Sequence, residues 1–183
     1  KSFATYLNLY QLLPLQRTCE LFEDIFHLRP SEATIINFNN KIYDNLETLE
    51  EDIKQSIINS PVVNFDETGT SVKGKTKWLH SASTDDLTYF SIHQKRGKEG
   101  MDDINILPHF KGVAVHDFWD SYKKFKACNH AFCNAHLIRE LRGIYENDPR
   151  QKWAFELLLL LCEIKYTVDN TKENTDGRSL TPL

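Results

Sequence analysis

Two short stretches of the sequence decide which fold to expect: Val62-Val63-Asn64-Phe65-Asp66 and Gly112-Val113-Ala114-Val115-His116-Asp117. Each is mostly apolar and β-branched, which favours a buried strand, and each finishes on an aspartate. A strand fixes the backbone of such an acid, while its carboxylate emerges at the edge of the sheet. We therefore expect two similar strands that end on their acids and serve one site.

The segment between these strands predicts a hairpin and a short helix. Residues 77–83 and 87–93 alternate in polarity on either side of Thr84-Asp85-Asp86, which favours a hairpin. A turn is also expected at Lys73-Gly74-Lys75, and residues 97–107 favour a short helix. The predicted order is thus strand, hairpin, helix, strand.

Apolar residues recur at helical spacing on both sides of this region. Residues 1–60 predict helices, of which one begins with Ser31 as its N-cap and carries an apolar face from Ile35 to Ile57. After the second aspartate we expect the start of a helix, a short strand and two helices, in residues 118–125, 127–132, 134–145 and 153–168. This order of elements indicates an α/β fold.

The charge of the chain is unevenly distributed. The formal net charge of −4 over 183 residues disfavours a simple basic nucleic-acid-binding domain. However, residues 1–66 carry 5 basic and 10 acidic side chains, whereas residues 67–143 carry 12 and 9. The segment that contains the second aspartate is therefore the basic part of the chain.

The composition also limits the class of protein and the cellular compartment that we expect. It is globular, with 40% hydrophobic and 26% charged residues, which excludes disorder and collagen-like repeats. The longest apolar run, Leu157 to Cys162, is far shorter than a membrane span, and no signal peptide precedes the four cysteines. We expect a cytoplasmic protein without disulfides or a membrane partner. Because the chain starts at Lys1 and finishes in a polar stretch, we also expect it to be a piece of a longer protein.

The two aspartates have a chemical and a structural interpretation. If their strands are neighbours, Asp66 and Asp117 form an anionic oxygen site suited to Mg²⁺ or Mn²⁺. Two such ions, roughly 3.5–4 Å apart, activate a water or hydroxyl and stabilise the leaving oxygen in phosphodiester chemistry. The alternative is that each aspartate caps a helix or a turn, for which Asp is strongly favoured.

A Cys/His cluster and one glutamate follow. Cys128, His130, Cys133 and His136 are competent zinc ligands, but their C-x-H-x-x-C-x-x-H spacing is tighter than the common finger patterns, so a buried cysteine beside a hydrogen-bonded His136 is favoured over zinc. Glu140 lies four residues after His136, on the same helical face, and offers either a third carboxylate or an ordinary ion pair. Spacing alone leaves both open.

Basic residues gather around the predicted hairpin, interleaved with aromatic and histidine side chains. They can hold a DNA backbone near the acids through phosphate contacts, or form an ordinary solvated face. The candidates for DNA contact are Lys73, Lys75, Lys77, Lys95 and Arg96.

Six ordered blocks carry a resemblance to a known family. They are Asp66-Glu67-Thr68-Gly69, Lys77-Trp78-Leu79-His80, His93-Gln94-Lys95-Arg96-Gly97, Ile106-Leu107-Pro108, Val115-His116-Asp117-Phe118-Trp119 with Tyr122, and Cys133-Asn134-Ala135-His136-Leu137-Ile138-Arg139-Glu140-Leu141. Together they closely resemble the catalytic core of bacterial insertion-sequence transposases of the sixty-six family. The resemblance is strong from Pro61 to about Trp153 and weaker in the helical start.

This resemblance implies a DDE transposase with an RNase H-like fold, in which a mixed sheet presents acids to two divalent ions, Mg²⁺ or Mn²⁺. Asp66 matches the first family aspartate and Asp117 the second. The implied activity is metal-dependent cleavage and strand transfer in DNA transposition, in the bacterial cytoplasm. The implied partners are the transposon ends, the target DNA and further copies of the protein.

The resemblance also implies a domain plan. Cys133 and His136 match a C-x-x-H signature, after which related transposases insert helices and place the catalytic glutamate well downstream. We therefore expect that glutamate outside this chain, with Glu140 as the weaker candidate, and an inactive chain on its own. The expected parts are a helical N-terminal region at 1–60, the first part of the RNase H-like core at 61–127, and the start of an insertion domain at 128–183.

Two alternatives remain at this stage. One is a non-catalytic nucleic-acid-binding module with a zinc site at the Cys/His cluster. The other is a nuclease on the same fold, which would cleave DNA without joining it. Metal content tests the first, and reaction products test the second.

Overall fold

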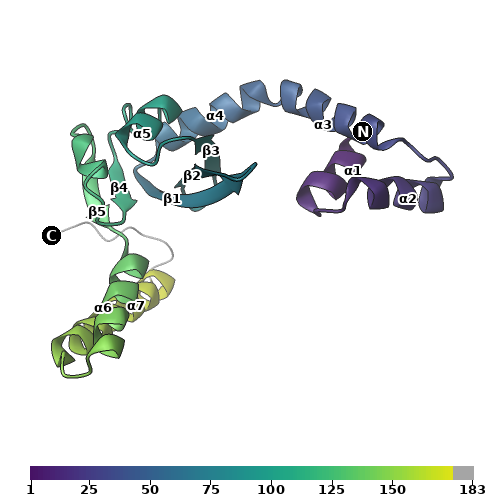
Figure 1. Ribbon diagram of the computed structural model, residues 1–183. Coiled ribbons are helices and arrows are strands. Elements are labelled where there is room, and N and C mark those ends of the chain that lie inside the picture. The colour runs from purple at the N-terminus through teal and green to yellow at the C-terminus, as the bar shows by residue number, and fades with distance from the viewer. Residues whose placement is uncertain (175–183) are drawn as a thin grey trace. The chain divides into compact units, whose positions relative to one another are not determined.

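The computed structural model describes residues 1–174, and its helices and strands are shown in Figure 1. The chain divides into two compact units, one formed by residues 1–56 and one that begins at Ile57. Among the described helices, none combines the length and the apolar character needed to cross a bilayer.

The first unit is helical, as predicted. It contains α1 (Ser2–Thr5), the π-helical turn η1 (Tyr6–Tyr10), α2 (Leu15–Phe26) and α3 (Glu32–Asn45), and α4 (Glu47–Ile58) continues past its end. Its core consists of three buried residues with three partly buried ones packed against them: Ala4, Cys19 and Ile35 with Leu15, Phe22 and Phe38.

The predicted cap at Ser31 is confirmed, but the long helix after it is not continuous. The Ser31 hydroxyl accepts a hydrogen bond from the Thr34 backbone N–H at 3.2 Å, so it satisfies one of the free donors at the helix start. At Leu46 the backbone N–H donates to the carbonyl of Tyr43 rather than to the residue four back. This tighter turn separates α3 from α4.

The second unit contains a five-stranded mixed sheet. Its strands are β1 (Val62–Val72), β2 (Lys75–Ser83), β3 (Thr88–His93), β4 (Val113–His116) and β5 (Asn129–Phe132), in the order β3-β2-β1-β4-β5. The first three strands are antiparallel neighbours, while β4 runs parallel to β1 and β5 parallel to β4. This is the α/β, RNase H-like arrangement that the resemblance implied.

The predicted order of strand, hairpin, helix and strand is confirmed, but the residue predicted to end the first strand was wrong. We expected β1 to stop at Asp66, whereas it continues to Val72. Its second half forms an unbroken antiparallel ladder with β2, from Asn64 opposite Ser83 to Val72 opposite Lys75. The turn between them is Lys73-Gly74, with φ of 52° and 73°, the left-handed pair that favours a tight hairpin.

Four further elements follow the hairpin. They are α5 (Lys98–Ile104), the 3₁₀ turn η2 (Tyr122–Lys124), α6 (Asn134–Asn147) and α7 (Lys152–Asn174). The helices expected within 97–107, 134–145 and 153–168 are thus present. Of the helix expected to begin within 118–125, only the three-residue 3₁₀ turn η2 forms, and the Asp117 side chain holds a turn before it by accepting the Trp119 N–H.

The face of the sheet on which α5 packs holds the core of the second unit. Along β1 the side chains alternate: Val63, Phe65 and Glu67 are buried, whereas Asn64 and Asp66 are exposed. Phe65 contacts the rings of Phe110 and Tyr122, with centroids 5.7 and 6.4 Å apart. We call this the covered face and the opposite side the open face.

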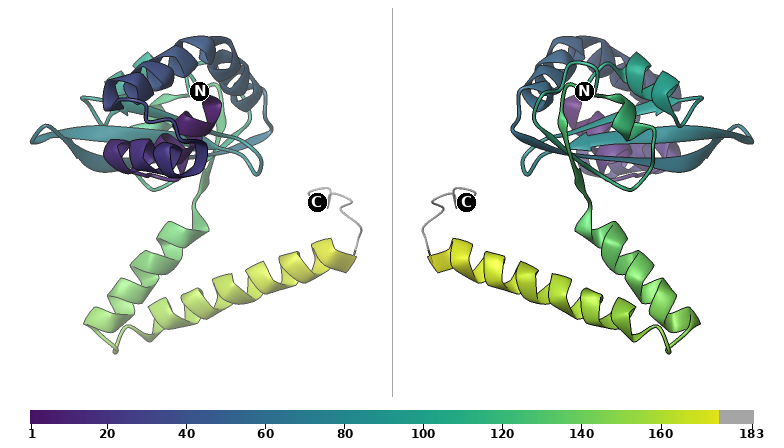
Figure 2. Two further views of the ribbon diagram at one scale, coloured as in Figure 1. Left: turned by 90° about the vertical axis from the view of Figure 1, so that its right-hand side faces the viewer. Right: turned by 90° about the vertical axis from the view of Figure 1, so that its left-hand side faces the viewer.

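The sheet ends after the expected core limit at residue 127. Strand β5 pairs with β4 from Asn129 to Phe132, so residues on both sides of position 127 belong to one sheet. Beyond it α6 and α7 form a helical hairpin, visible in Figure 2, in which the rings of Tyr145 and Phe155 stack 4.9 Å apart.

Candidate active site

Asp66 lies in the central strand of the sheet, on the open face. Its side chain alternates with the buried Phe65 and Glu67, and its Oδ1 accepts the Glu67 backbone N–H at 2.9 Å. Within residues 1–174 it has no ion-pair partner. An exposed carboxylate fixed by a strand backbone is available to a ligand from solvent.

Asp117 follows β4 directly, one residue after the strand ends at His116. The parallel ladder of β1 and β4 ends at the pair Asn64 and Val115. Each aspartate lies two residues beyond this pair, Asp66 still within β1 and Asp117 in the turn after β4. The predicted juxtaposition of the two strands is therefore present.

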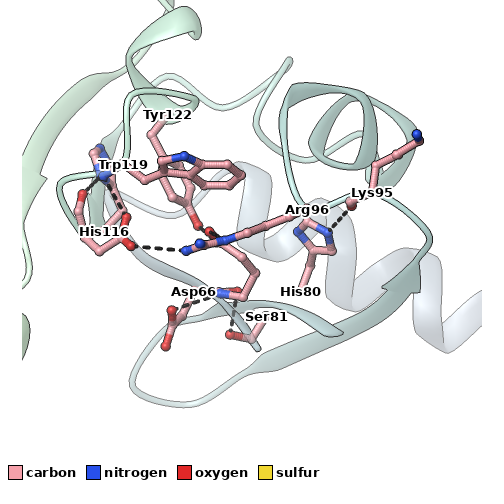
Figure 3. Close-up of polar contacts among 10 residues, drawn as sticks. Asp66, His80, Ser81, Lys95, Arg96, His116, Trp119 and Tyr122 are labelled. Carbon is pink, nitrogen blue, oxygen red and sulfur yellow. Dashed lines mark hydrogen bonds and ion pairs between the residues drawn. The ribbon is translucent and has the colours of Figure 1, made fainter. Parts of the chain in front are cut away.

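Arg96 connects Asp117 to the covered face. Its Nε donates a hydrogen bond to Glu67 Oε1 at 3.0 Å, and its Nη2 lies 3.5 Å from Asp117 Oδ2. The guanidinium carbon lies 4.1 Å from the ring centroid of Trp119 and 5.1 Å from that of Trp78. Figure 3 shows the Arg96 side chain extended beside Trp119 and Tyr122.

Glu67 is the buried acid that receives Arg96. Its side chain is only 1% exposed, and the Tyr122 hydroxyl donates to its Oε2. Burial raises the pKa of Glu67, while the hydrogen bonds from Tyr122 and Arg96 oppose that shift. Burial and the nearby carboxylate also raise the pKa of Tyr122, so its hydroxyl remains a donor.

Sequence reasoning placed Glu67 and Tyr122 in family blocks but gave them no role. The period of two along β1 already puts Glu67 on the same face as Phe65, and an acid on a buried face requires a partner. That pattern was the available signal. The identity of the partners depends on contacts across 29 and 55 residues of sequence.

A cleft of about 510 Å³ lies beside Asp117. Its lining residues are Arg96, Asp117, Phe118, Trp119, His136 and Glu140. Glu140, the weaker candidate for the third acid, thus shares a cleft with the second aspartate. Among residues 1–174, however, no three His, Cys, Asp or Glu side chains are close enough together to hold a metal ion.

The Cys/His cluster does not form a zinc site in the described part of the chain. Both ring nitrogens of His130 are occupied, one 2.9 Å from His116 Nε2 and the other 2.9 Å from the Phe125 carbonyl oxygen. Cys128 is buried, with its thiol 3.6 Å from the same oxygen. The zinc-stabilised module is therefore not supported, because Cys128 and His130 contact protein groups instead. The hydrogen bond that we expected from His136 is wrong at one ring nitrogen: its buried Nδ1 has no hydrogen-bond partner among residues 1–174.

His116 is buried between the sheet and η2. Its ring stacks on Tyr122 with centroids 4.3 Å apart, and burial lowers its pKa. Its carbonyl oxygen accepts the backbone N–H of Cys133, the residue that precedes α6, at 2.8 Å. The start of α6 is thus fixed to the residue next to Asp117.

The basic residues predicted for DNA contact fall into two groups. Lys73, Lys75 and Lys95 are exposed, and Lys77 is partly exposed in β2. Arg96 instead makes the internal contacts described above. The lysines are therefore free to meet an external anion, whereas Arg96 is held at the site itself.

Comparison with solved structures finds retroviral integrases. The chain is 15% identical to an integrase catalytic core domain of HTLV-2, solved with magnesium in a dimeric form, with 54% of this chain and 81% of that chain covered and a TM-score of 0.32. It is also 15% identical to a chain of the simian T-cell lymphotropic virus intasome in complex with PP2A regulatory subunit B56 gamma, with a TM-score of 0.32. It covers 46% of that chain.

Comparison with curated proteins gave no significant match. Comparison with protein families gave one that covers nearly the whole chain: residues 2–180 match the family described as "Transposase IS66 family", with its DDE domain. The chain therefore belongs to the IS66 family of transposases.

Proposed function

We propose that this chain supplies the first two acids, Asp66 and Asp117, of a DNA transposase that cleaves phosphodiester bonds and transfers strands. The observation that carries the proposal is the register of β1 and β4, which puts both aspartates two residues past one ladder pair. The proposed substrate is DNA. The transposase is proposed to associate with further copies of itself and to act in the bacterial cytoplasm.

The donor chemistry of the two residues fits Mg²⁺ or Mn²⁺. Carboxylate oxygens are hard ligands, and Mg²⁺ is commonly held by one or two carboxylates, with substrate phosphates and water completing its shell. A pair of acids without a third therefore suits it. When bound, two divalent ions activate the attacking oxygen and stabilise the leaving oxygen.

The protein groups around this pair have separate tasks. The Trp119 backbone N–H fixes one oxygen of Asp117 at 2.9 Å, and the strand backbone fixes Asp66. The exposed lysines of the hairpin, Lys73 and Lys75, are proposed to hold the DNA backbone by its phosphates, without base reading. The helices that begin with α6 are proposed to start an insertion in the catalytic region.

Titration of the protein with Mn²⁺, followed by calorimetry, tests the proposed metal site. We expect binding to weaken at least tenfold in Asp66→Asn and in Asp117→Asn. A matched control is Asp120→Asn, because the Asp120 side chain is 84% exposed and its ion-pair partner within residues 1–174 is the surface residue Lys123. Equal Mn²⁺ binding by all four proteins would refute the site.

The third acid is tested separately. We expect no strand transfer by this chain with Mg²⁺ and labelled duplex DNA. Mg²⁺-dependent joining that is lost in both Asp66→Asn and Glu140→Gln would contradict that expectation and assign the third carboxylate to Glu140. Cleavage without joining would favour a nuclease on the same fold.

A further inference from the structure

Several contacts restrain the Arg96 side chain, although it is partly exposed to solvent. Its side chain is 36% exposed, yet its Nε is bonded to Glu67 and its guanidinium lies near the rings of Trp119 and Trp78. Cation–π contacts with two indoles and a charge-assisted hydrogen bond restrict its rotation. The guanidinium is therefore kept facing Asp117.

Glu67 restrains Arg96 and also accepts the Tyr122 hydroxyl. A carboxylate that is only 1% exposed costs free energy to desolvate, and such groups persist where their partners require them. The Tyr122 hydroxyl occupies Oε2, and Arg96 occupies Oε1. Both oxygens of Glu67 are thus committed within the protein, and Arg96 is the only cation among their hydrogen-bond partners in the described residues.

The two oxygens of Asp117 are in different situations. Oδ1 accepts the Trp119 backbone N–H at 2.9 Å, whereas Oδ2 lies 3.5 Å from Arg96 Nη2. The second distance exceeds that of an ordinary hydrogen bond, so Arg96 balances the charge of Asp117 without occupying its lone pairs. Oδ2 can therefore still bind a metal ion, but it does so beside the fixed positive charge of Arg96.

We propose that Glu67 is a positioning residue that holds Arg96 as a resident cation, which weakens divalent-ion binding at Asp117 until a DNA phosphate adds negative charge. The proposal rests on the proposed function, because it assumes that Asp66 and Asp117 hold the ions. Without DNA, the carboxylates of Asp66, Asp117 and Glu67 together with the Arg96 guanidinium carry a net charge of −2, against −3 for the three acids alone. A phosphate restores the negative charge that a second cation needs, so that metal and DNA binding favour each other.

The test measures the affinity for Mn²⁺ alone and with a duplex oligonucleotide, by calorimetry at constant ionic strength. Arg96→Gln should bind Mn²⁺ roughly tenfold more tightly without DNA, because one nearby positive charge is gone. Its affinity should then gain less from added DNA than that of the unmodified protein. Lys95→Gln is the control, since it removes the same charge from an exposed neighbour outside the contacts with Glu67 and Asp117.

A double variant separates positioning from a general structural effect. Glu67→Gln removes a negative charge, which by itself weakens Mn²⁺ binding, but it also releases the arginine from its place beside Asp117. We therefore expect Glu67→Gln to weaken Mn²⁺ binding less in the unmodified protein than in Arg96→Gln, where no arginine is left to release. Tyr122→Phe loosens the same carboxylate without removing a charge, so it should tighten Mn²⁺ binding by less than Arg96→Gln does, and it replaces Glu67→Gln if that variant does not fold, as judged by circular dichroism.

Two results would overturn the inference. One is Mn²⁺ binding by Arg96→Gln that is unchanged or weaker, which would mean that Arg96 assists the acids. The other is additive effects of the two substitutions, which would mean that Glu67 acts independently of Arg96. Failure of the proposed function has a different signature, namely Mn²⁺ binding that ignores Asp66→Asn and Asp117→Asn.

Discussion

Asp66 and Glu67 are adjacent acids on opposite faces of one strand, and the structure treats them in opposite ways. Asp66 is exposed on the open face, while Glu67 is buried on the covered face with two hydrogen-bond donors. The same functional group is thus left available to a ligand at one position and committed to the protein at the next. Alternation along β1, rather than residue type, decides which acid can serve as a ligand.

The largest expected effect is a difference in protein stability between substitutions at these two acids. Glu67→Ala leaves Tyr122 and Arg96 without their buried acceptor, and we expect it to lower the free energy of unfolding by about 2 to 4 kcal/mol. Asp66→Asn should change it by less than about 0.5 kcal/mol, because the side chain is exposed. Urea denaturation of both variants measures the difference. Similar losses of unfolding free energy at Asp66 and Glu67 would contradict the assignment of one acid to an exposed face and the other to a buried face.

The next effect tests how closely the covered face is packed. A Cβ on Gly100 would lie 2.4 Å from the Lys95 carbonyl oxygen and 2.9 Å from His93 Nδ1, so Gly100→Ala forces α5 away from the strands. We expect a loss of about 1 to 3 kcal/mol in thermal or urea unfolding.

Gly143 provides the matched control in α6. A Cβ there meets nothing within 4 Å, and Gly143→Ala should stabilise by up to about 1 kcal/mol through helix propensity. If Gly100→Ala is as harmless as Gly143→Ala, then α5 is not closely packed on the sheet.

The smallest effect is a pH dependence on the same face. His80 is buried, its Nε2 lies 3.1 Å from the Lys95 carbonyl oxygen, and burial lowers its pKa below the ordinary value of about 6.5. As the pH falls below about 6.5, the unfolded chain takes up a proton that the folded chain does not, so stability falls; above that pH His80 contributes no slope.

His80→Gln keeps a donor for the Lys95 carbonyl oxygen and cannot titrate. We expect its unfolding free energy to fall by about 1 kcal/mol less than that of the unmodified protein between about pH 7 and pH 5. Urea denaturation at both pH values measures this difference. Parallel curves for the two proteins would show that His80 is protonated as easily in the fold as in the unfolded chain.

Local patterns were sufficient for much of the fold. The apolar runs at 62–66 and 112–117, the alternation in the hairpin and the Ser31 cap each depend on neighbours in sequence, and each is present. The full length of β1 was missed, because residues after Asp66 are strand only through their ladder with β2. The helix expected after Asp117 is reduced to the 3₁₀ turn at Tyr122–Lys124, since the hydrogen bond from the Trp119 N–H to the Asp117 side chain holds a turn at its expected start.

The candidate site was predictable in part. Asp66 and Asp117 followed from strand-terminal acids and from the family blocks; the expected pairing of their strands is present, and their role as ligands stays a prediction. The restraint on Arg96 did not follow, because Glu67 and Tyr122 are remote from one another in sequence and meet only in the folded sheet. Arg96 resembled the neighbouring lysines in the sequence, whereas in the fold its partners are internal.

The hydrogen bond between the Cys133 N–H and the His116 carbonyl oxygen links the helical hairpin of α6 and α7 to the end of strand β4. It anchors the first turn of α6 one peptide unit away from Asp117, and residues of that helix line the same cleft as the acid. A tilt of α6 would pull on the backbone that aims this carboxylate. One backbone hydrogen bond therefore couples the orientation of the α6–α7 hairpin to the position of the acid proposed as a metal ligand.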